Sequence, residues 1–385
     1  MGNNSDLYPR WVGSRYALLY RQNPYSDEVT REIQTGFYGR PLDARKPGDP
    51  VSQESFVYPL YVVFLMAPTV TVPFATVQAV FRWLLLLSLA GSVPLWMQAA
   101  GARTQLLYLV AGMILAVSNY PAILEFHMQN LAALVFLFLA SAGALVAHGR
   151  QVLAGFCLAL ATIKPEVSWL VVLWFLFWAI SDYSARKRLV WSFLASMLTL
   201  ILAAEAMVPH WIGWFIIAVR QYPNYGTEPN IFQIFLPIWL ANAVAVGLIA
   251  LLLRFWWQWR KASPGQTEFG WALALTAAVT LAILPKLSAY NQPLLIPALI
   301  LLLTTQEANL GLLGRAFRKS AFACQIWQWL AALMLSICSL AVPATRLLKA
   351  SQWPLLTFLA LPPTTLLAVI FVTFAIQRAS RSTTA

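Results

Sequence analysis

The stretch EFHMQNLAALVFLFLASAGALVAHGR, residues 125–150, contains the pattern that decides the fold class. Its centre, residues 131–147, is an apolar run with one serine, Ser141, and it is followed by a histidine and an arginine at 148 and 150. A helix formed by this run is apolar on every side, so it lacks the polar stripe of a surface helix in a soluble protein. Such a run is typical of a helix inside a lipid bilayer, where about 20 apolar residues are needed to cross.

Runs of the same kind recur along the chain. Of the 385 residues, 60% are apolar and 10% are charged, and the mean hydropathy is +0.67. A soluble protein carries about 25% charged residues. We therefore predict an all-α, polytopic integral membrane protein with about 10–12 membrane helices. It has a polar region with short amphipathic helices at residues 1–55 (helices 11–21 and 27–36) and a multi-span transmembrane domain at 56–385. The predicted membrane segments are 57–75, 78–98, 105–119, 129–147, 152–163, 166–181, 189–208, 231–253, 270–284, 290–304, 323–343 and 353–376.

The charges indicate how the chain is oriented. Residues 1–55 hold seven basic and seven acidic side chains, so the rest of the chain carries the whole net charge of +12. Its lysines and arginines lie in short connections between apolar runs, which is the positive-inside pattern and indicates cytoplasmic loops. No basic stripe on a soluble fold is present, so nucleic acid is excluded as a partner.

The remaining connections are polar and carry few basic residues, which indicates the opposite side of the membrane. They are NYPAILEFHMQN, IKPE, PHWIGWFIIAVRQYPNYGTEPN and ILPKLSAYNQP. Ionisable groups at membrane depth usually serve function. We therefore expect these connections to meet in one site. The sequence leaves two alternatives for the side of the membrane on which residues 1–55 lie. They are cytoplasmic if 57–75 crosses the membrane, and exterior if 57–75 enters the membrane and returns to the same side.

Asp6 is the candidate catalytic residue. A carboxylate kept ionised by a nearby cation could accept the proton of a hydroxyl group. Tyr8 and Arg10 beside it are candidate substrate-binding residues. Two simpler interpretations compete, a solvated aspartate and the N-cap of a helix that starts near Pro9.

The connection IKPE places Lys164 between two apolar runs. Its ammonium group could bind a phosphate as a point charge. It could instead extend to the membrane interface, or pair with Glu166. Positive charge is disfavoured on the predicted exterior side, which favours a functional role for Lys164.

Two further connections carry hydrogen-bonding groups at predicted helix ends. Such groups suit a sugar or a phosphate, although Asn130 could also cap the following helix. Three scattered histidines and the absence of known nucleotide or zinc motifs give no expectation of a metal or cofactor. The candidates in these connections are His127, Gln129, Asn130, Lys286, Tyr290 and Asn291.

Several motifs in this order resemble glycosyltransferase family 87. They are the Asp6 segment SDLYPRW, Asn23-Pro24-Tyr25, Tyr58-Pro59-Leu60, Met128-Gln129-Asn130 and Lys164-Pro165-Glu166. The resemblance covers residues 3–180 well and 280–300 weakly. The sequence departs from the family pattern in two places: only one proline follows Tyr58, and Met128 stands where the family has a glycine. The family also has a transmembrane helix before its Asp-bearing loop; either this helix is lost here or Met1 is an internal start.

The resemblance implies the C-type membrane glycosyltransferase fold and a polyprenyl-phosphate-dependent transferase. Such an enzyme moves a hexose, with mannose as the first candidate, to a lipid or glycan acceptor with inversion. It also implies that Asp6 is the base, that residues 1–55 are exterior, and that the active site faces away from the cytoplasm at the plasma membrane. A transporter or flippase for a lipid-linked sugar and a catalytically inactive relative are the alternatives.

The predicted orientation can be tested with single cysteines. Ser26→Cys lies in the neutral region and Ser184→Cys in the basic connection DYSARKR. We expect an impermeant thiol reagent to label Ser26→Cys from the exterior and Ser184→Cys only after the membrane is opened. Labelling of Ser26→Cys from the cytoplasm alone would contradict a shared exterior site.

Overall fold

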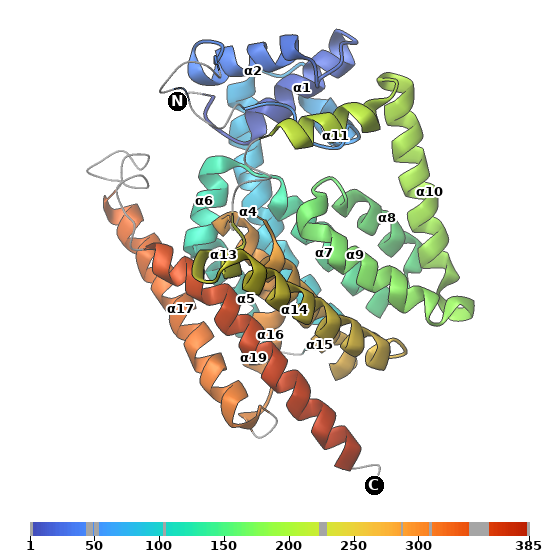
Figure 1. Ribbon diagram of the computed structural model, residues 1–385, viewed down its shortest axis with the longest axis vertical. Helices are drawn as coiled ribbons and strands as arrows, with labels where there is room; N and C mark the ends of the chain where they lie inside the picture. The colour runs from blue at the N-terminus through green and yellow to red at the C-terminus, as the bar shows by residue number, and fades with distance from the viewer. Residues whose placement is uncertain are drawn as a thin grey trace.

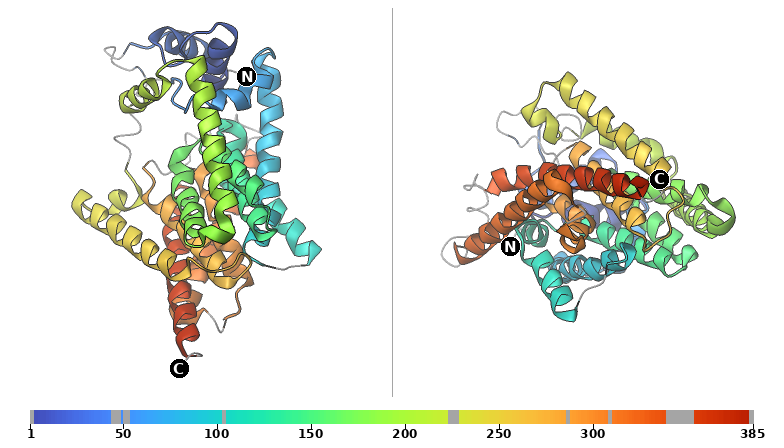
Figure 2. Two further views of the ribbon diagram at one scale, coloured as in Figure 1. Left: turned by 90° about the vertical axis from the view of Figure 1, so that its right-hand side faces the viewer. Right: turned by 90° about the horizontal axis from the view of Figure 1, so that it is seen from below.

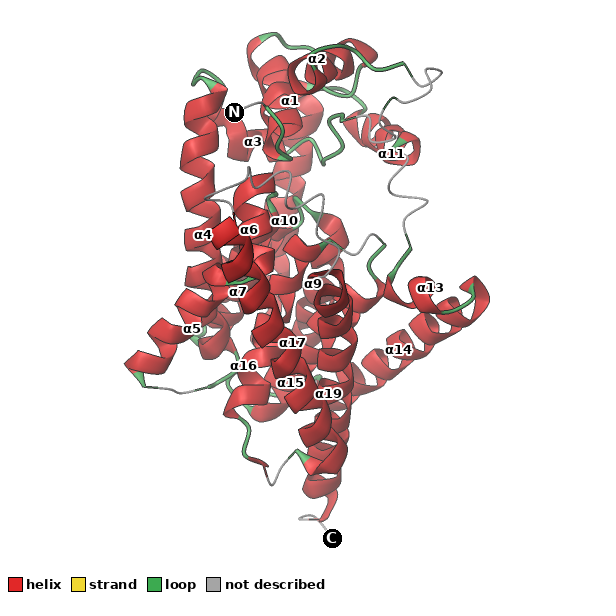
Figure 3. Ribbon diagram, turned by 90° about the vertical axis from the view of Figure 1, so that its left-hand side faces the viewer, coloured by secondary structure: helices red, strands yellow, loops and turns green. Residues whose placement is uncertain are grey.

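The computed structural model describes residues 3–43, 49, 54–102, 105–222, 229–285, 288–307, 310–338 and 354–382. In these residues the chain forms helices and no strand, as Figure 3 shows. Helices α1 (Leu7–Leu19), α2 (Asp27–Tyr38) and α11 (Trp211–Gln221) lie at one end of the molecule, and the C-terminus lies at the other (Figure 1).

Four helices of the described residues are long and apolar enough to span a membrane. They are α4 (Phe74–Ala99), α10 (Tyr183–Met207), α14 (Ile238–Trp259) and the segment Leu359–Arg378 of α19 (Pro354–Ser382). A fifth span is possible if α5 (Leu106–Ser118) and α6 (Tyr120–Met128), which meet at a bend of 55°, act together. The predicted all-α fold with membrane-spanning helices is confirmed in the described residues, which hold four or five candidate spans where about 10–12 membrane helices were predicted.

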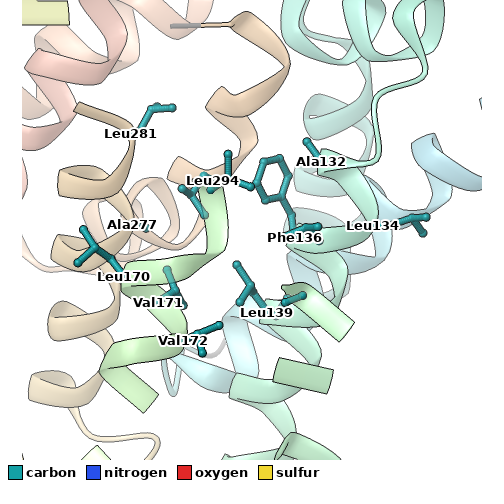
Figure 4. Close-up of a cluster of buried hydrophobic side chains, with 14 of the residues drawn as sticks. Ala132, Leu134, Phe136, Leu139, Leu170, Val171, Val172, Ala277, Leu281 and Leu294 are labelled. Carbon is teal, nitrogen blue, oxygen red and sulfur yellow. The ribbon is translucent and has the colours of Figure 1, made fainter. Parts of the chain in front are cut away.

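Shorter apolar helices form the centre of the molecule. These are α7 (Ala132–Ala147), α8 (Gln151–Ala161), α9 (Pro165–Ile180), α15 (Thr267–Ile283), and the 3-10 helix η2 (Ala289–Leu295) with α16 (Ile296–Thr304). Side chains from α7, α9, α15 and η2, among them Phe136, Val171 and Leu294, interlock in a core closed to solvent (Figure 4). The elements that carry the predicted polar connections are thus packed against one another.

Small residues allow the helices to approach closely. A Cβ atom at Gly143 of α7 would lie 2.7 Å from the Cβ of Ala99 at the end of α4. Helices in lipid do not associate through the hydrophobic effect, so close packing of this kind stabilises their contacts instead. Most apolar side chains of α10 and α14 are partly or fully exposed, and Figure 2 shows both helices along the side of the molecule.

The predicted membrane helix at 57–75 is wrong. The chain there forms only α3 (Val62–Met66) and the 3-10 helix η1 (Ala67–Thr69), which pack against each other and against α1. Eight helical residues rise about 12 Å, far less than the roughly 30 Å of a bilayer core. Prolines at 59, 68 and 73 interrupt the run because proline lacks an N–H donor.

Other boundaries agree or differ for local reasons. The predicted break at Lys164-Pro165 is confirmed, since α9 begins at Pro165. The connection at 119–130, expected to be a loop, contains α6: Asn119 caps it through its side chain, and Pro121 occupies its first turn.

The predicted helix 231–253 is divided at Pro237 into α13 (Ile231–Phe235) and α14. The predicted helices 11–21 and 323–343 begin earlier, as α1 and as α17 (Gly311–Cys338).

Candidate functional site

Six segments that are distant in sequence line one polar cavity of about 130 Å³. They are the start of α1, the irregular segment before α3, the α6–α7 junction, the α8–α9 junction, the end of α11 and the segment that leads into η2. The expectation that the polar connections meet is confirmed for these segments. The lining residues are Asp6, Pro9, Arg10, Glu54, Ser55, Val57, Tyr58, Asn130, Lys164, Glu166, Tyr222, Pro285, Ser288, Tyr290 and Asn291.

Asp6 is fixed through both its backbone and its side chain. Its backbone N–H donates to the carbonyl oxygen of Met128 (2.7 Å), at the end of α6. Its Oδ2 accepts a hydrogen bond from the side-chain amide of Asn130 (2.7 Å). Asp6 immediately precedes α1 but makes no capping hydrogen bond to that helix. The capping interpretation of Asp6 is therefore not realised; the carboxylate faces the cavity and is partly exposed.

Asn130 lies between this carboxylate and the Lys164 ammonium. Its Oδ1 accepts from Nζ of Lys164 (2.7 Å) and from the backbone N–H of Ala132 (3.1 Å). The amide therefore has only one consistent orientation, with its oxygen toward the cation and its NH₂ group toward Asp6. Asn130 couples the lysine to the carboxylate through two charge-assisted hydrogen bonds.

Lys164 is buried, with 3% of its surface exposed. A second amide oxygen, Oδ1 of Asn291, accepts from its ammonium group (3.0 Å), and the Tyr290 ring lies 4.8 Å away at its centroid. A carboxylate oxygen of Glu166 is 3.9 Å from Nζ. Burying an ammonium ion is costly unless oxygen acceptors and a counter-charge replace water, and this site supplies both. The Glu166 pair and the functional role are thus compatible.

Arg10 lies one helical turn after Asp6 and reaches the same cavity. Its guanidinium group donates to the Tyr58 hydroxyl (2.7 Å) and lies 4.1 Å from the centroid of that ring. Burial raises the pKa of Tyr58 above its usual value, although Arg10 opposes this effect. Tyr58 is therefore a neutral phenol that accepts from Arg10 and keeps its own O–H for donation.

The Asn23-Pro24-Tyr25 turn has a structural role beside this wall. Asn23 Oδ1 accepts from the backbone N–H of Tyr25 (3.0 Å), which closes the turn. The Tyr25 hydroxyl then donates to the backbone carbonyl of Tyr58 (2.6 Å). The turn thereby holds the backbone of Tyr58 in place.

An apolar pocket of about 370 Å³ adjoins the polar cavity. The two spaces share Val57, Tyr58 and Glu166 as a common wall. Helix α11 provides much of the apolar side, and its C-terminal Arg220 lies at the rim. The other lining residues are Pro59, Ile163, Pro165, Phe215, Ile216 and Val219.

Most of the predicted site residues line the cavity. The seven that do are Asp6, Arg10, Asn130, Lys164, Glu166, Tyr290 and Asn291.

Three predicted residues do not line the cavity, and Lys286 lies outside the described residues. Tyr8 is buried against Trp11 and Phe74. His127 packs edge-on against Phe126. Gln129 adopts a left-handed backbone, which directs its side chain to the carbonyl oxygen of Gln78 (3.0 Å).

The sequence reasoning missed the residues that close the cavity from the N-terminal side. Tyr58 was noticed only as part of a motif, and its aromatic hydroxyl before a proline was the available signal. Glu54 and Ser55 precede it, but a charged and a small polar side chain in an irregular segment gave no distinguishing signal. The other missed lining residues with polar side chains are Tyr222 and Ser288.

Among the described residues, no three His, Cys, Asp or Glu side chains are grouped so that they could hold a metal ion. Comparison of the chain with protein-family models and with curated proteins finds no match. The interpretation of the cavity therefore depends on its own chemistry.

Lys164 is the first residue to test. Lys164→Ala removes the cation that orients Asn130 and should abolish activity with little change in the amount of folded protein in membranes. Lys164→Arg keeps the charge in a different geometry and should retain part of the activity. Quantitative blotting and size-exclusion chromatography measure the folded amount. Loss of folded protein in both variants would instead assign Lys164 a structural role.

Tyr25→Phe tests whether the turn supports the site. It removes one hydroxyl and leaves the buried Tyr58 carbonyl without its donor, which should cost about 1 kcal/mol of stability. We expect a lower melting temperature and reduced turnover. Tyr20→Phe, at an exposed position on α1's end, is the matched control and should change neither. Wild-type behaviour of Tyr25→Phe would show that the turn does not hold Tyr58.

Proposed function

We propose that this protein is a membrane glycosyltransferase that moves a hexose from a polyprenyl-phosphate donor to a lipid or glycan acceptor. One observation carries the proposal: a polar cavity lined by two cations and by the carboxylates of Asp6, Glu54 and Glu166 shares a wall with an apolar pocket. A lipid-linked sugar has the same two parts, a polar sugar phosphate and an apolar chain.

The shared wall is where the donor's phosphate would lie. Tyr58 faces both spaces, and Arg10 is hydrogen-bonded to it. Lys164 also lines the cavity and adds positive charge, and its hydrogen bonds to Asn130 and Asn291 hold its ammonium group in place. In this arrangement the first isoprene units occupy the pocket beside Phe215 and Val219, and the sugar extends toward Asp6.

Asp6 suits the role of general base. Asn130 occupies its Oδ2, and among the described residues nothing hydrogen-bonds to its Oδ1. An acceptor hydroxyl would give its proton to Asp6 while its oxygen forms a bond to the anomeric carbon. The bond from that carbon to the phosphate oxygen breaks, and the polyprenyl phosphate leaves with the electron pair. Arg10 and Lys164 would stabilise the charge that develops on the phosphate.

The proposal includes the C-type glycosyltransferase fold with about 10–12 membrane helices. The shorter apolar helices around α7 and α15 would then lie within the bilayer beside the four long ones. The end with α1, α2 and α11 would face the exterior of the plasma membrane. The neutral charge of residues 1–55 and the short α3 support this orientation.

The direct test is transfer of a labelled hexose from polyprenyl phosphate by membranes that contain the protein. We expect a labelled product with the opposite anomeric configuration to the donor. Movement of the intact donor across proteoliposomes without transfer would favour the transporter, and neither activity would favour an inactive relative. Polyprenyl-phosphate mannose is the first donor to use.

Asp6→Asn separates the catalytic role from a structural one. The asparagine keeps the size and still accepts from Asn130, but it cannot take up the proton. Turnover should fall by roughly a hundredfold or more, the scale of general-base catalysis, while donor binding survives. Initial rates and donor binding measure the two effects. Near-normal turnover in Asp6→Asn would overturn the assignment of the base.

A further inference from the structure

Helix α17 buries polar side chains and exposes apolar ones. Gln325 and Gln328 are 6% and 1% exposed, whereas Ile326 and Leu333 are 52% and 57% exposed. The buried Gln328 side chain donates to Oε1 of Gln292 in η2 (2.7 Å). A surface helix of a soluble protein has the opposite arrangement, with its apolar side toward the core. The exposed side of α17 therefore faces lipid chains rather than water.

The exposed side of α17 begins at basic residues and continues as an apolar face. Helix α17 packs along α19, and Figure 1 shows its first turns toward the end of the molecule where the C-terminus lies. The exposed residues on this face recur at steps of three and four, at positions 319, 323, 326, 330 and 333. From Lys319 to Leu333 the helix rises about 21 Å, which is enough to cross the roughly 15 Å of one hydrocarbon leaflet.

Two hollows follow this face and share Ile326. The first has a volume of about 450 Å³, and it is lined by Leu303 of α16 and by Arg318, Lys319, Phe322, Ala323 and Ile326 of α17. The second, of about 510 Å³, lies between α17 and the α5–α6 pair. The Trp329 indole N–H, at its edge, donates to the carbonyl oxygen of Leu115 (3.0 Å), which joins α17 to α5. Its other apolar lining residues include Ile123, Leu330 and Leu333.

The two cations of the first hollow are held differently. Arg318 donates to the Glu307 carboxylate and to the carbonyl oxygens of Leu302 and Thr305 (3.5 Å each), at the end of α16. Lys319 is exposed, and its ammonium group has no hydrogen bond or ion pair to any of the described residues. Arg318 therefore forms part of the wall, whereas the charge of Lys319 is available to a ligand.

We propose that this face of α17 binds one anionic phospholipid of the leaflet on the side where the C-terminus lies. The phosphate group lies at Lys319, beside Arg318, and one acyl chain follows the two hollows past Ile326. Basic residues between membrane helices bind anionic headgroups on the cytoplasmic side, and the basic connection GRAFRKS is predicted to be cytoplasmic. This inference does not depend on the proposed transferase function.

Native mass spectrometry of the detergent-purified protein measures binding at this site. The probes are phosphatidylglycerol, which is anionic, and phosphatidylethanolamine, which is zwitterionic. We expect the first phosphatidylglycerol to bind the wild type more tightly than the first phosphatidylethanolamine. Lys319→Gln should weaken phosphatidylglycerol binding about fivefold, the scale of one basic side chain at an anionic membrane surface. Lys319→Arg keeps the charge and should bind as the wild type does.

Further variants separate the site from general charge and from lipid around the whole protein. Lys187→Gln removes the same charge from an exposed position on α10 and should leave phosphatidylglycerol binding unchanged. Ala323→Trp fills the first hollow, keeps every charge, and should weaken phosphatidylglycerol binding. Ala195→Trp, at an exposed position on α10, is its matched control and should bind as the wild type does.

Three results would overturn the proposal. Equal affinity of the wild type for both lipids would show that the site does not select an anionic headgroup. An equal loss in Lys187→Gln and Lys319→Gln would show that binding follows net charge alone. Unchanged phosphatidylglycerol binding in Ala323→Trp would show that no acyl chain occupies the first hollow.

Discussion

The burial of one ammonium group organises the site. Lys164 lies between two apolar helices, where an unpaired cation would be strongly unfavourable. Its oxygen partners come from two other places, Asn130 ahead of α7 and Asn291 in η2. These three residues lie at or beside α7, α9 and η2, and the apolar side chains of these elements contribute to the central core. Packing of the core and satisfaction of the lysine therefore require the same arrangement of three segments.

The N-terminal region completes this arrangement, and its own apolar side chains, among them Leu7 and Trp11, belong to the same hydrophobic core. Asp6 joins it through Met128 and Asn130, and Arg10 joins it through Tyr58. Tyr61 adds a further tie, since its hydroxyl group meets Oγ1 of Thr162 (2.9 Å) near the α8–α9 junction. These contacts hold the polar segment over the cavity.

Much of this organisation could be predicted from the sequence, and the failures have physical causes. Apolar runs and the Lys164-Pro165 break are local signals, and the polar character of the connections indicated that they would meet in one site, as they do at the cavity. The helix α6 was missed because its proline and charged residues resemble a loop, although Asn119 and Pro121 are good helix-start residues.

The misplaced site residues also have identifiable causes. Tyr8 is two residues from Asp6 and from Arg10, so on a helix it points to a different face, and this signal was available. The direction of Gln129 depends on a left-handed backbone that a non-glycine residue seldom adopts, so the sequence did not indicate it.

The central claim is that a lipid phosphate lies at the wall between the polar cavity and the apolar pocket. The most direct measurement is a cryo-EM map of the protein in lipid nanodiscs with added polyprenyl phosphate. The account predicts phosphate density within hydrogen-bonding distance of Arg10 or Tyr58, and isoprenoid density along Phe215 and Val219 of α11. Lipid density elsewhere on the protein, with both spaces empty at saturating ligand, would contradict it.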